Sequence, residues 1–294
     1  MEKFLSKYIE DMLKKELSKN TIEAYKRDLI KFGEFLNKRH EDILDSDMVS
    51  IMAYVQTLKK ERKADSSIIR SLVAIRNFYK FLIKTGQNID NPLINYEVPK
   101  NKRTLPETLT VDEVDKFLSA PDCNEYKGIR DKAMLELMYA TGMKVSELLR
   151  ITIFDVNLKL SYIKCKGAKD KERIIPIGSY AVNCLNEYLK VRDRMNADNL
   201  ELLFCNLRGG KMTRQGFWKI VKKYAKDANI NKKIDSYTLR HSFAVHLLQN
   251  GADMKSVQEL LGHNTIATTQ IYSSISKKIK LLMSIKRHIQ GLKT

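Results

Sequence analysis

Three residues near the C-terminal end of the chain have types and spacing that suit chemistry on an anion: Arg240, His263 and Tyr272. A phenol is a weak nucleophile at neutral pH, because its unperturbed pKa is about 10. It becomes effective when cationic donors hold an anionic electrophile against it and stabilise the charge that develops. The spacing allows short helices to bring the guanidinium, the imidazole and the phenol to one point. This predicts attack by Tyr272 on a phosphodiester.

The charge of the chain indicates which molecule carries that phosphodiester. Lys and Arg number 53 against 35 Asp and Glu, a formal net charge of +18. Up to residue 100 there are 19 basic and 15 acidic residues, and after it 34 and 20, so the excess lies mainly with the three reactive residues. This distribution suits DNA as a polyanionic partner, although a solvated lysine-rich surface has the same composition.

Length and composition exclude several classes of protein. A chain of 294 residues is long enough for two domains. No apolar stretch reaches the roughly 18–20 residues that span a bilayer, and the N-terminus lacks the pattern of a signal peptide. The four cysteines are scattered without a Cys-x-x-Cys pair, so neither a zinc site nor a disulfide framework is expected. We therefore expect a cytoplasmic protein with no membrane contact, no metal and no cofactor.

The chain is expected to be mainly α-helical with a small β-hairpin sheet, in two domains. Residues 1–90 have apolar positions at helical spacing and predict about four helices, one of them capped by Asn20 with Glu23. The segment 91–106 holds three of the five prolines and no periodicity, which predicts a linker. Residues 107–294 are expected to form the second, larger domain.

The second domain is predicted to begin at a capping box, Thr110 with Glu113. A strongly apolar helix follows over Arg130–Tyr139. Alternating β-rich segments at Leu160–Cys165 and Arg173–Ile177, joined by a lysine-rich turn, predict a hairpin. Further helices are predicted at 179–195, 213–228, 236–250, 253–261, 265–272 and 276–291.

Longer motifs surround the reactive residues. The first is Tyr139-Ala-Thr-Gly-Met-Lys-Val-Ser-Glu147-Leu, and the second is Lys166-Gly followed by Lys-Glu-Arg-Ile-Ile-Pro. The third comprises Leu239-Arg-His-Ser-Phe-Ala-Val-His246, Leu260-Leu-Gly-His263 and Thr268-Thr-Gln-Ile-Tyr272. Together they resemble the boxes of the tyrosine recombinase (phage integrase) family, and within it the Xer type of cellular recombinase. The resemblance covers nearly the whole chain, and a tyrosine nine residues after the histidine is a specific signal.

By this resemblance the chain is expected to be a site-specific DNA recombinase. Tyr272 would form a covalent 3′-phosphotyrosine, which conserves the energy of the broken bond and needs no cofactor. Arg240 would donate two hydrogen bonds to the non-bridging oxygens, and His263 would donate another. Lys166, on the hairpin, would protonate the leaving 5′ oxygen as general acid. The 5′ hydroxyl of a second strand would then attack the phosphotyrosine, and exchange would proceed through a Holliday junction.

Two expected catalytic positions depart from the family pattern. Lys144 aligns with the first catalytic arginine of the family, and lysine keeps the charge but loses the bidentate fork. Loss of one charge-assisted hydrogen bond costs ~1.5–3 kcal/mol, or roughly ten- to a hundred-fold in rate. Tyr237 stands where histidine or lysine is usual, three residues before Arg240, and a phenol does not readily take up a proton. We expect a site that is weakened rather than inactive. It would be slow, dependent on activation, or rearranged, for example with Arg150 as a substitute donor.

Several other side chains have two interpretations. His241 either orients its helix or carries a proton, and His246 is expected in the core or lining the site. Glu147 either holds Lys144 or a neighbouring donor in place, or caps a helix. Trp218 is expected in the core.

Basic side chains outside the site are candidates for contact with DNA, and solvation explains each of them equally well. They are Lys100, Lys102, Arg103, Lys169, Lys171, Arg214 and Lys222. Lys169 and Lys171 also compete with Lys166 for the general-acid role. Lys166 is preferred because it directly precedes Gly167, as in the family.

The resemblance implies a clamp, in which the helical core-binding domain and the catalytic domain close on opposite faces of duplex DNA. Four protomers, identical or paired with a paralogous recombinase, would assemble on two recombination sites through a C-terminal exchange helix at 276–292. The helical pattern begins near residue 1 and leaves no room for an arm-binding domain, which favours the Xer type.

Chromosome dimer resolution is the expected role, and a cell-division DNA translocase is a further candidate partner. Alternatives remain open. They are an integrase or transposase of a mobile element, a catalytically weakened DNA-binding partner that needs a second recombinase, and a type IB topoisomerase.

Overall fold

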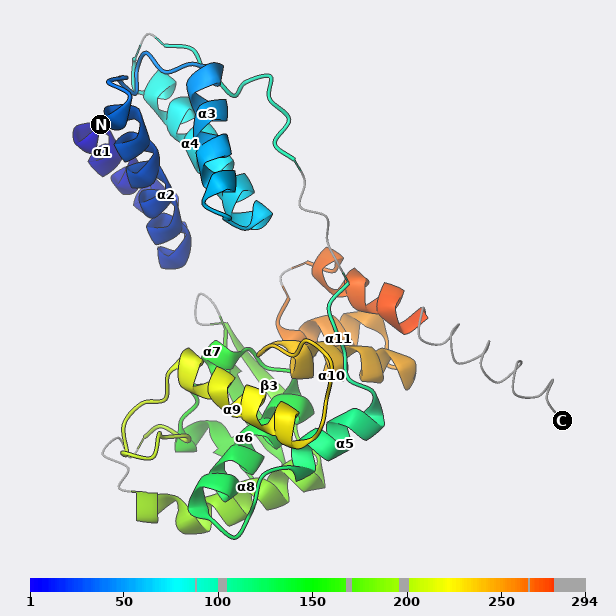
Figure 1. Ribbon diagram of the computed structural model, residues 1–294. Coiled ribbons are helices and arrows are strands. Elements are labelled where there is room, and N and C mark those ends of the chain that lie inside the picture. Colours follow the sequence, from blue (N-terminus) through cyan, green and yellow to red (C-terminus); the bar gives the residue numbers. More distant parts are fainter. Residues whose placement is uncertain (88, 100–104, 168–170, 196–200, 264, 278–294) are drawn as a thin grey trace, which may run out of the picture. The chain divides into compact units, whose positions relative to one another are not determined.

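Figure 1 shows the computed structural model of the chain, in which residues 1–87, 89–99, 105–167, 171–195, 201–263 and 265–277 are described. The chain divides into two compact units, Met1–Thr104 and Leu105–Thr294. Some predicted features lie outside the described residues: Lys100, Lys102 and Arg103 in the predicted linker, Lys169 in the hairpin turn, and most of the helix predicted at 276–292.

In its described part the first unit contains four helices: α1 (Glu2–Lys14), α2 (Lys19–Lys38), α3 (Met48–Lys60) and α4 (Asp65–Lys84). The cap predicted at Asn20 with Glu23 is wrong. The hydroxyl of Ser18 accepts the N–H of Thr21 at 3.1 Å, so α2 begins two residues earlier than predicted.

An apolar core and one polar pair hold the first unit together. Leu29 and Phe32 of α2 and Phe78 of α4 are fully buried in that core. Nε and Nη2 of Arg70 donate to the two carboxylate oxygens of Asp28 at 2.8 and 3.1 Å. This two-pronged contact fixes α4 against α2.

The helix α6 (Tyr126–Thr141) is central to the second unit. A run of its side chains has no exposed surface: Ala133, Met134, Leu135, Leu137 and Met138. A helix that is apolar on nearly all sides must be covered on nearly all sides. The helices α8 (Ser179–Arg192) and α10 (Thr238–Gln249) pack against it.

The other elements of the second unit surround α6, α8 and α10. They are the helices α5 (Val111–Ser119), α7 (Val145–Leu148), α9 (Arg214–Asp227) and α11 (Met254–Leu261), and the 3₁₀ turns η1 (Ile153–Asp155) and η3 (Asp193–Met195). Residues 267–277 are also helical. None of the described helices is both long and apolar enough to cross a membrane.

Three antiparallel strands form the sheet, in the order β1 (Val156–Asn157), β2 (Tyr162–Lys166), β3 (Glu172–Pro176). Cys165 lies opposite Arg173, and Lys166 opposite Glu172. Because side chains alternate along a strand, Cys165 is buried and Lys166 is exposed. The predicted hairpin is confirmed, whereas the two-residue strand β1 was not predicted.

A buried ion pair lies on the first turns of α6. Nε and Nη2 of Arg130 donate to Oδ1 of Asp131 at 2.9 and 2.7 Å, and Nη1 donates to the carbonyl of Cys205 at 3.1 Å. The hydroxyl of Tyr224 on α9 donates to the other carboxylate oxygen at 3.0 Å. The pair therefore joins α6 to α9 and to the segment around Cys205.

Besides the hairpin, one sequence prediction in this unit is confirmed and two are wrong. The capping box of Thr110 and Glu113 is present at the start of α5. The break predicted between the helices 265–272 and 276–291 is absent, because residues 267–277 form one continuous helix. No Gly or Pro interrupts that stretch, and Tyr272 and Ile275 share its buried face.

Trp218 does not lie in the core as predicted, and 40% of its surface is exposed. The buried face of α9 consists of Phe217, Ile220, Val221, Tyr224 and Ala225. The indole therefore falls on the opposite, solvent-facing side of the helix, where the ammonium of Lys222 lies 4.1 Å from the ring centroid.

Replacement of Asp131 by alanine is expected to destabilise the second unit by about 3–5 kcal/mol, because the Arg130 guanidinium would stay buried without its partner. Glu187→Ala is the matched control, since it removes an exposed carboxylate that pairs with Lys190 and is expected to cost less than about 1 kcal/mol. Urea unfolding followed by the fluorescence of the single tryptophan, Trp218, measures both. Equal losses in the two variants would contradict a structural role for the buried pair.

Candidate active site

Arg240 lies in the first turn of α10 and is 3% exposed. Its Nη1 donates to the carbonyl of Gly142 at 2.5 Å, and its Nη2 donates to the carbonyl of Leu261 at 2.8 Å. Gly142 caps the C-terminus of α6 and Leu261 is the last residue of α11, so the guanidinium lies at two helix C-termini. Among the described residues no carboxylate forms an ion pair with Arg240. The partial negative charge of the helix ends stabilises the buried cation instead.

Glycines make this close approach of the helix ends feasible. Gly142 and Gly262 have φ values of 57° and 64°, which place both in the left-handed region at a helix C-terminus. A Cβ on Gly262 would lie 2.8 Å from Nη1 of Arg173, and a Cβ on Gly142 would lie 2.3 Å from the ring of Phe243. Both helix ends therefore favour glycine for two reasons: the backbone has a positive φ, and a Cβ would collide with a neighbouring side chain.

His263 directly follows Gly262, and contacts at both of its ring nitrogens orient the imidazole. Nη2 of Arg240 lies 2.9 Å from Nε2 of His263, and Nδ1 lies 2.9 Å from Oγ1 of Thr269. Because a guanidinium only donates, Nε2 accepts and the ring proton is assigned to Nδ1, which donates to Thr269. Burial, and then the charge of Arg240, lowers the pKa of His263 to about 4, so the ring is neutral at pH 7.

Tyr272 lies on the helix 267–277 with 3% of its surface exposed. Its hydroxyl oxygen is 2.9 Å from Nδ1 of His241, and its ring is nearly parallel to that of His263, with 6.2 Å between the centroids. Burial raises the pKa of Tyr272, and the charge of Arg240 and a hydrogen bond to it act in the opposite direction. The phenol is therefore protonated at rest and lies against a cation that favours its ionised form.

The Tyr272 helix packs on a small apolar cluster of its own. The buried members of this cluster are Ala244, Val245, Val257, Leu261, Tyr272 and Ile275. A different set of buried residues, from α5 through α9 and the start of α10, forms the main core of the unit.

Arg173 enters the site although the sequence analysis did not single it out. Nη1 and Nη2 donate to the two oxygens of Glu147 at 3.1 and 2.8 Å, and Nε donates to the carbonyl of Leu260 at 2.8 Å. The side chain thus joins β3, α7 and the last turn of α11, next to His263. The alternation of side chains along the strand could have indicated that Arg173 faces inward, because it shares a face of β3 with the buried Ile175.

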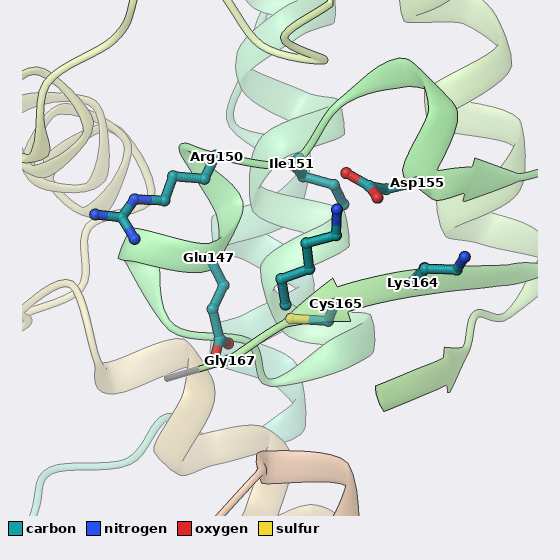
Figure 2. Close-up of a pocket in the computed structure, with 8 residues that line it drawn as sticks. Glu147, Arg150, Ile151, Asp155, Lys164, Cys165 and Gly167 are labelled. Atoms are coloured by element: carbon teal, nitrogen blue, oxygen red, sulfur yellow. The ribbon is translucent and has the colours of Figure 1, made fainter. Parts of the chain in front are cut away.

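Glu147 has both of the roles proposed for it. One of its carboxylate oxygens accepts the backbone N–H of Lys144 at 2.7 Å, which caps α7, and both oxygens bind Arg173. Among the described residues the ammonium of Lys144 has no hydrogen-bond partner, but its charge helps to lower the pKa of His263. Arg150, the expected substitute donor, is exposed and extends away from the Glu147 carboxylate (Figure 2).

Lys166 ends β2 with its side chain 58% exposed and its Nζ 3.8 Å from Oε1 of Glu172. A cavity of about 160 Å³ lies beside it (Figure 2), lined by Glu147, Arg150, Ile151, Asp155, Lys164, Cys165, Lys166 and Gly167. No hydrogen bond within the described ranges joins Lys166 to Arg240, His263 or Tyr272. The hairpin therefore presents the lysine beside the cluster without fixing it there.

Two further predicted residues lie at the edge of the cluster. Tyr237 precedes α10 and is 44% exposed, and its ring stacks on His241 at a centroid distance of 6.3 Å. His246 is buried, with Nδ1 2.9 Å from the hydroxyl of Tyr139 and Nε2 3.0 Å from the carbonyl of Leu109. His246 is thus a core residue, as one of its two interpretations predicted.

Three of the predicted DNA-contacting residues are exposed. Lys171 lies at the end of the hairpin turn, and Arg214 and Lys222 lie one turn before and one turn after Trp218 on the outer face of α9. Lys219 and Lys223 are exposed on the same helix. This outer face of α9, which we call the basic face, carries an aromatic ring among cations, a combination that suits a nucleic acid.

The assembled groups can act on a phosphodiester. The arrangement brings a nucleophile, a cation held by neutral carbonyls and two imidazoles into one buried cluster, whereas Lys144, Lys166 and Tyr237 flank it. No group of three or more His, Cys, Asp or Glu side chains within the described parts of the chain could hold a metal ion. The guanidinium of Arg240 is a side-chain donor that can stabilise charge developing on a phosphodiester.

Comparison with known proteins gives two family matches that together cover most of the chain. Residues 107–278 match the Phage integrase family, and residues 5–86 match the Phage integrase, N-terminal SAM-like domain.

Individual relatives extend over nearly the full length. The protein named Tyrosine recombinase XerD from Listeria innocua is 43% identical over 274 residues, which cover 90% of this chain and 91% of the relative. The protein of the same name from Staphylococcus haemolyticus is 42% identical over 283 residues, which cover 94% and 95%. Among solved structures, the XerH site-specific recombinase bound to palindromic difH substrate in a post-cleavage complex has a TM-score of 0.76 and 25% identity, over 90% of this chain and 80% of that one.

Gly262→Ala is expected to destabilise the second unit more than Gly251→Ala does. Both glycines have positive φ, so each alanine carries a backbone cost of about 1–2 kcal/mol. Only the Cβ at position 262 would also collide with Arg173, since the Cβ at position 251 has no atom within 4 Å. Urea unfolding of the two variants measures the difference. Equal stabilities would show that the side chain of Arg173 can move away from the new Cβ at no cost in stability.

Proposed function

Because the chain belongs to the Phage integrase family and is a tyrosine recombinase, we propose that it cuts and rejoins DNA at specific sites through Tyr272, in chromosome dimer resolution. The observation that carries this proposal is the buried cluster of Arg240, His263 and Tyr272. The names of the XerD relatives support the Xer role. Such a role places the protein with the chromosome, in the cytoplasm.

In the proposed reaction the oxygen of Tyr272 attacks the phosphorus, the bond from phosphorus to the 5′ oxygen breaks, and a 3′-phosphotyrosine forms. Arg240 stabilises the charge on the non-bridging oxygens, since its cation is held by carbonyls that do not neutralise it. His263 is a second donor once phosphate draws Arg240 away from Nε2 and the ring takes up a proton. Phosphate favours that proton, because a nearby negative charge raises the pKa of an imidazole.

Lys166 is the proposed general acid. Its exposed side chain lies at the end of β2, and its partner Glu172 is 3.8 Å away, a weak ion pair that competes little with DNA. A lysine free to turn can deliver its proton to the leaving 5′ oxygen, and Lys171 is the alternative donor on the same hairpin.

The basic face of α9 is proposed to bind the DNA backbone. Arg214 and Lys222 supply charge, and the exposed Trp218 supplies apolar contact with sugar or base. The predicted contacts of Lys100, Lys102, Arg103 and Lys169 remain part of the proposal. Binding is expected to weaken steeply with salt.

The assembly is proposed to contain four protomers on two recombination sites, linked by the helix predicted at 276–292. Support comes from the structure of the XerH site-specific recombinase, in which that protein is bound to palindromic difH substrate. A paralogous recombinase or a cell-division DNA translocase is proposed to complete or activate the complex. Lys144 favours dependence on such a partner, because lysine lacks the two-pronged donor geometry of the arginine that is usual at this position.

The test is covalent trapping on a randomised library of nicked suicide duplexes, in which cleavage releases a short fragment that carries the 5′ hydroxyl, so that the strand cannot be rejoined. Wild-type protein is expected to select a defined sequence and to form an adduct that resists denaturation, whereas Tyr272→Phe is expected to bind DNA and form none. Tight, salt-sensitive binding without an adduct, even with a second recombinase present, would instead identify a DNA-binding partner. Relaxation of plasmids without a preferred sequence would identify a topoisomerase.

Lys144→Arg is expected to raise the rate of adduct formation roughly ten- to a hundred-fold on the selected duplex, because it restores a bidentate donor. Lys164→Arg is the matched control, an exposed lysine on β2 beside the same cavity, and is expected to change the rate less than about two-fold. A single-turnover time course on a denaturing gel measures both. An unchanged rate in Lys144→Arg would show that Arg240 and Arg173 already supply the charge that the reaction needs.

A further inference from the structure

Among the described residues, His241 is the hydrogen-bonded neighbour of the Tyr272 hydroxyl that is able to take its proton. Nδ1 of His241 lies 2.9 Å from the phenolic oxygen, with 5.6 Å between the ring centroids. Both side chains belong to the described part of the second unit, His241 on α10 and Tyr272 on the helix 267–277. The contact therefore spans two elements and is not imposed by sequence proximity.

The other groups near the phenol are unsuited to accept a proton. Arg240 only donates hydrogen bonds. The contacts of His263 are to Nη2 of Arg240 at Nε2 and to Thr269 at Nδ1, and neither ring nitrogen is hydrogen-bonded to the phenol. His241 is different, because its Nδ1 points at the phenol and no carboxylate or guanidinium within the described residues hydrogen-bonds to either ring nitrogen.

The surroundings of His241 keep a lone pair available at neutral pH. Burial lowers the pKa of His241, the charge of Arg240 lowers it further, and Asp235 opposes both. Of the other titratable groups near the ring, Tyr237 is stacked on it, Tyr272 lies against it, and His263 is electrostatically coupled to it. A neutral imidazole can accept from the phenol, whereas an imidazolium cannot.

Building on the proposed function, we propose that His241 is the general base that removes the proton of Tyr272 during DNA cleavage and returns it during rejoining. As the phenolic oxygen bonds to phosphorus, its proton passes to Nδ1 of His241, and the electron pair of the broken bond leaves with the 5′ oxygen, which takes a proton from Lys166. In rejoining, the incoming 5′ hydroxyl attacks phosphorus and gives its proton to the neutral amine that Lys166 became during cleavage. The bond from phosphorus to Tyr272 breaks, and the imidazolium of His241 protonates the released phenolate. Protons and electrons balance without a metal or a cofactor.

This assignment gives Tyr237 a role that suits a phenol. Its ring lies against His241 at an interplanar angle of 28° and shields one face of the imidazole from water. It orients the base without exchanging a proton. Tyr237→Phe is therefore expected to keep most of the cleavage rate, because the phenylalanine ring preserves the stacking.

Single-turnover cleavage of the nicked duplex selected by wild-type protein tests the proposal. His241→Ala is expected to lower the rate by 10²–10⁴-fold, the usual contribution of a general base, with DNA affinity unchanged. Because burial lowers the pKa of His241, wild-type activity is expected to fall only at a pH more acidic than the ordinary titration range of histidine, and this acid limb is expected to disappear in His241→Ala. Added imidazoles are expected to restore cleavage in His241→Ala, in increasing order of their basicity.

Two variants distinguish proton transfer from positioning. His241→Asn keeps a hydrogen-bonding group near the phenol but cannot take a proton, so full activity in this variant would overturn the proposal. His246→Gln is the matched control, a buried histidine of the same helix outside the site, and is expected to cleave within a few-fold of wild type.

A measurement without DNA separates this inference from the proposed function. In ¹⁵N NMR spectra of the wild-type protein at pH 7, His241 is expected to carry its proton on Nε2 and to leave Nδ1 unprotonated. Tyr272→Phe is expected to shift the Nδ1 resonance. A proton found on Nδ1 of His241 would overturn the proposal even if wild-type protein forms the Tyr272 adduct, whereas absence of any adduct would refute the proposed function itself.

Discussion

The rest of the site depends on the two hydrogen bonds that the buried guanidinium of Arg240 donates to carbonyls at helix ends. Its two carbonyl acceptors lie 98 and 21 residues away in the chain, so one side chain joins the ends of α6 and α11 to α10. Because these acceptors are helix-end carbonyls, they stabilise the cation without cancelling its charge. A carboxylate partner would have made the same structural link and left nothing to attract a phosphodiester.

That uncancelled charge sets the protonation of its neighbours. Arg240, Lys144 and Arg173 all lower the pKa of His263, and burial keeps the phenol of Tyr272 protonated. The resting site is therefore a set of neutral reactants around a fixed cation. A phosphodiester supplies the missing negative charge, so binding of DNA itself changes which groups hold protons.

The clustering of Arg240, His263 and Tyr272 could be predicted from the sequence, because their motifs are local and each residue lies on a short helix or at its end. Arg173 escaped prediction because its role depends on a pairing with Glu147, 26 residues away, that only strand register and helix placement create. Trp218 was misplaced for a different reason: its size favours burial, but its angular position on α9 puts it opposite the buried face. Lys166 was singled out by its neighbour Gly167, whereas its position relative to Arg240 and Tyr272 depends on the geometry of the hairpin.

The separate apolar cluster under the Tyr272 helix has an energetic consequence. Each fully buried aliphatic side chain contributes roughly 1.5–3 kcal/mol, and the cluster has six buried members, only two of which, Tyr272 and Ile275, come from the helix 267–277. Detachment of that helix would leave the main core intact, at a free-energy cost comparable with that of binding a ligand. Attachment of the Tyr272 helix is thus a local equilibrium, separate from the unfolding of the main core.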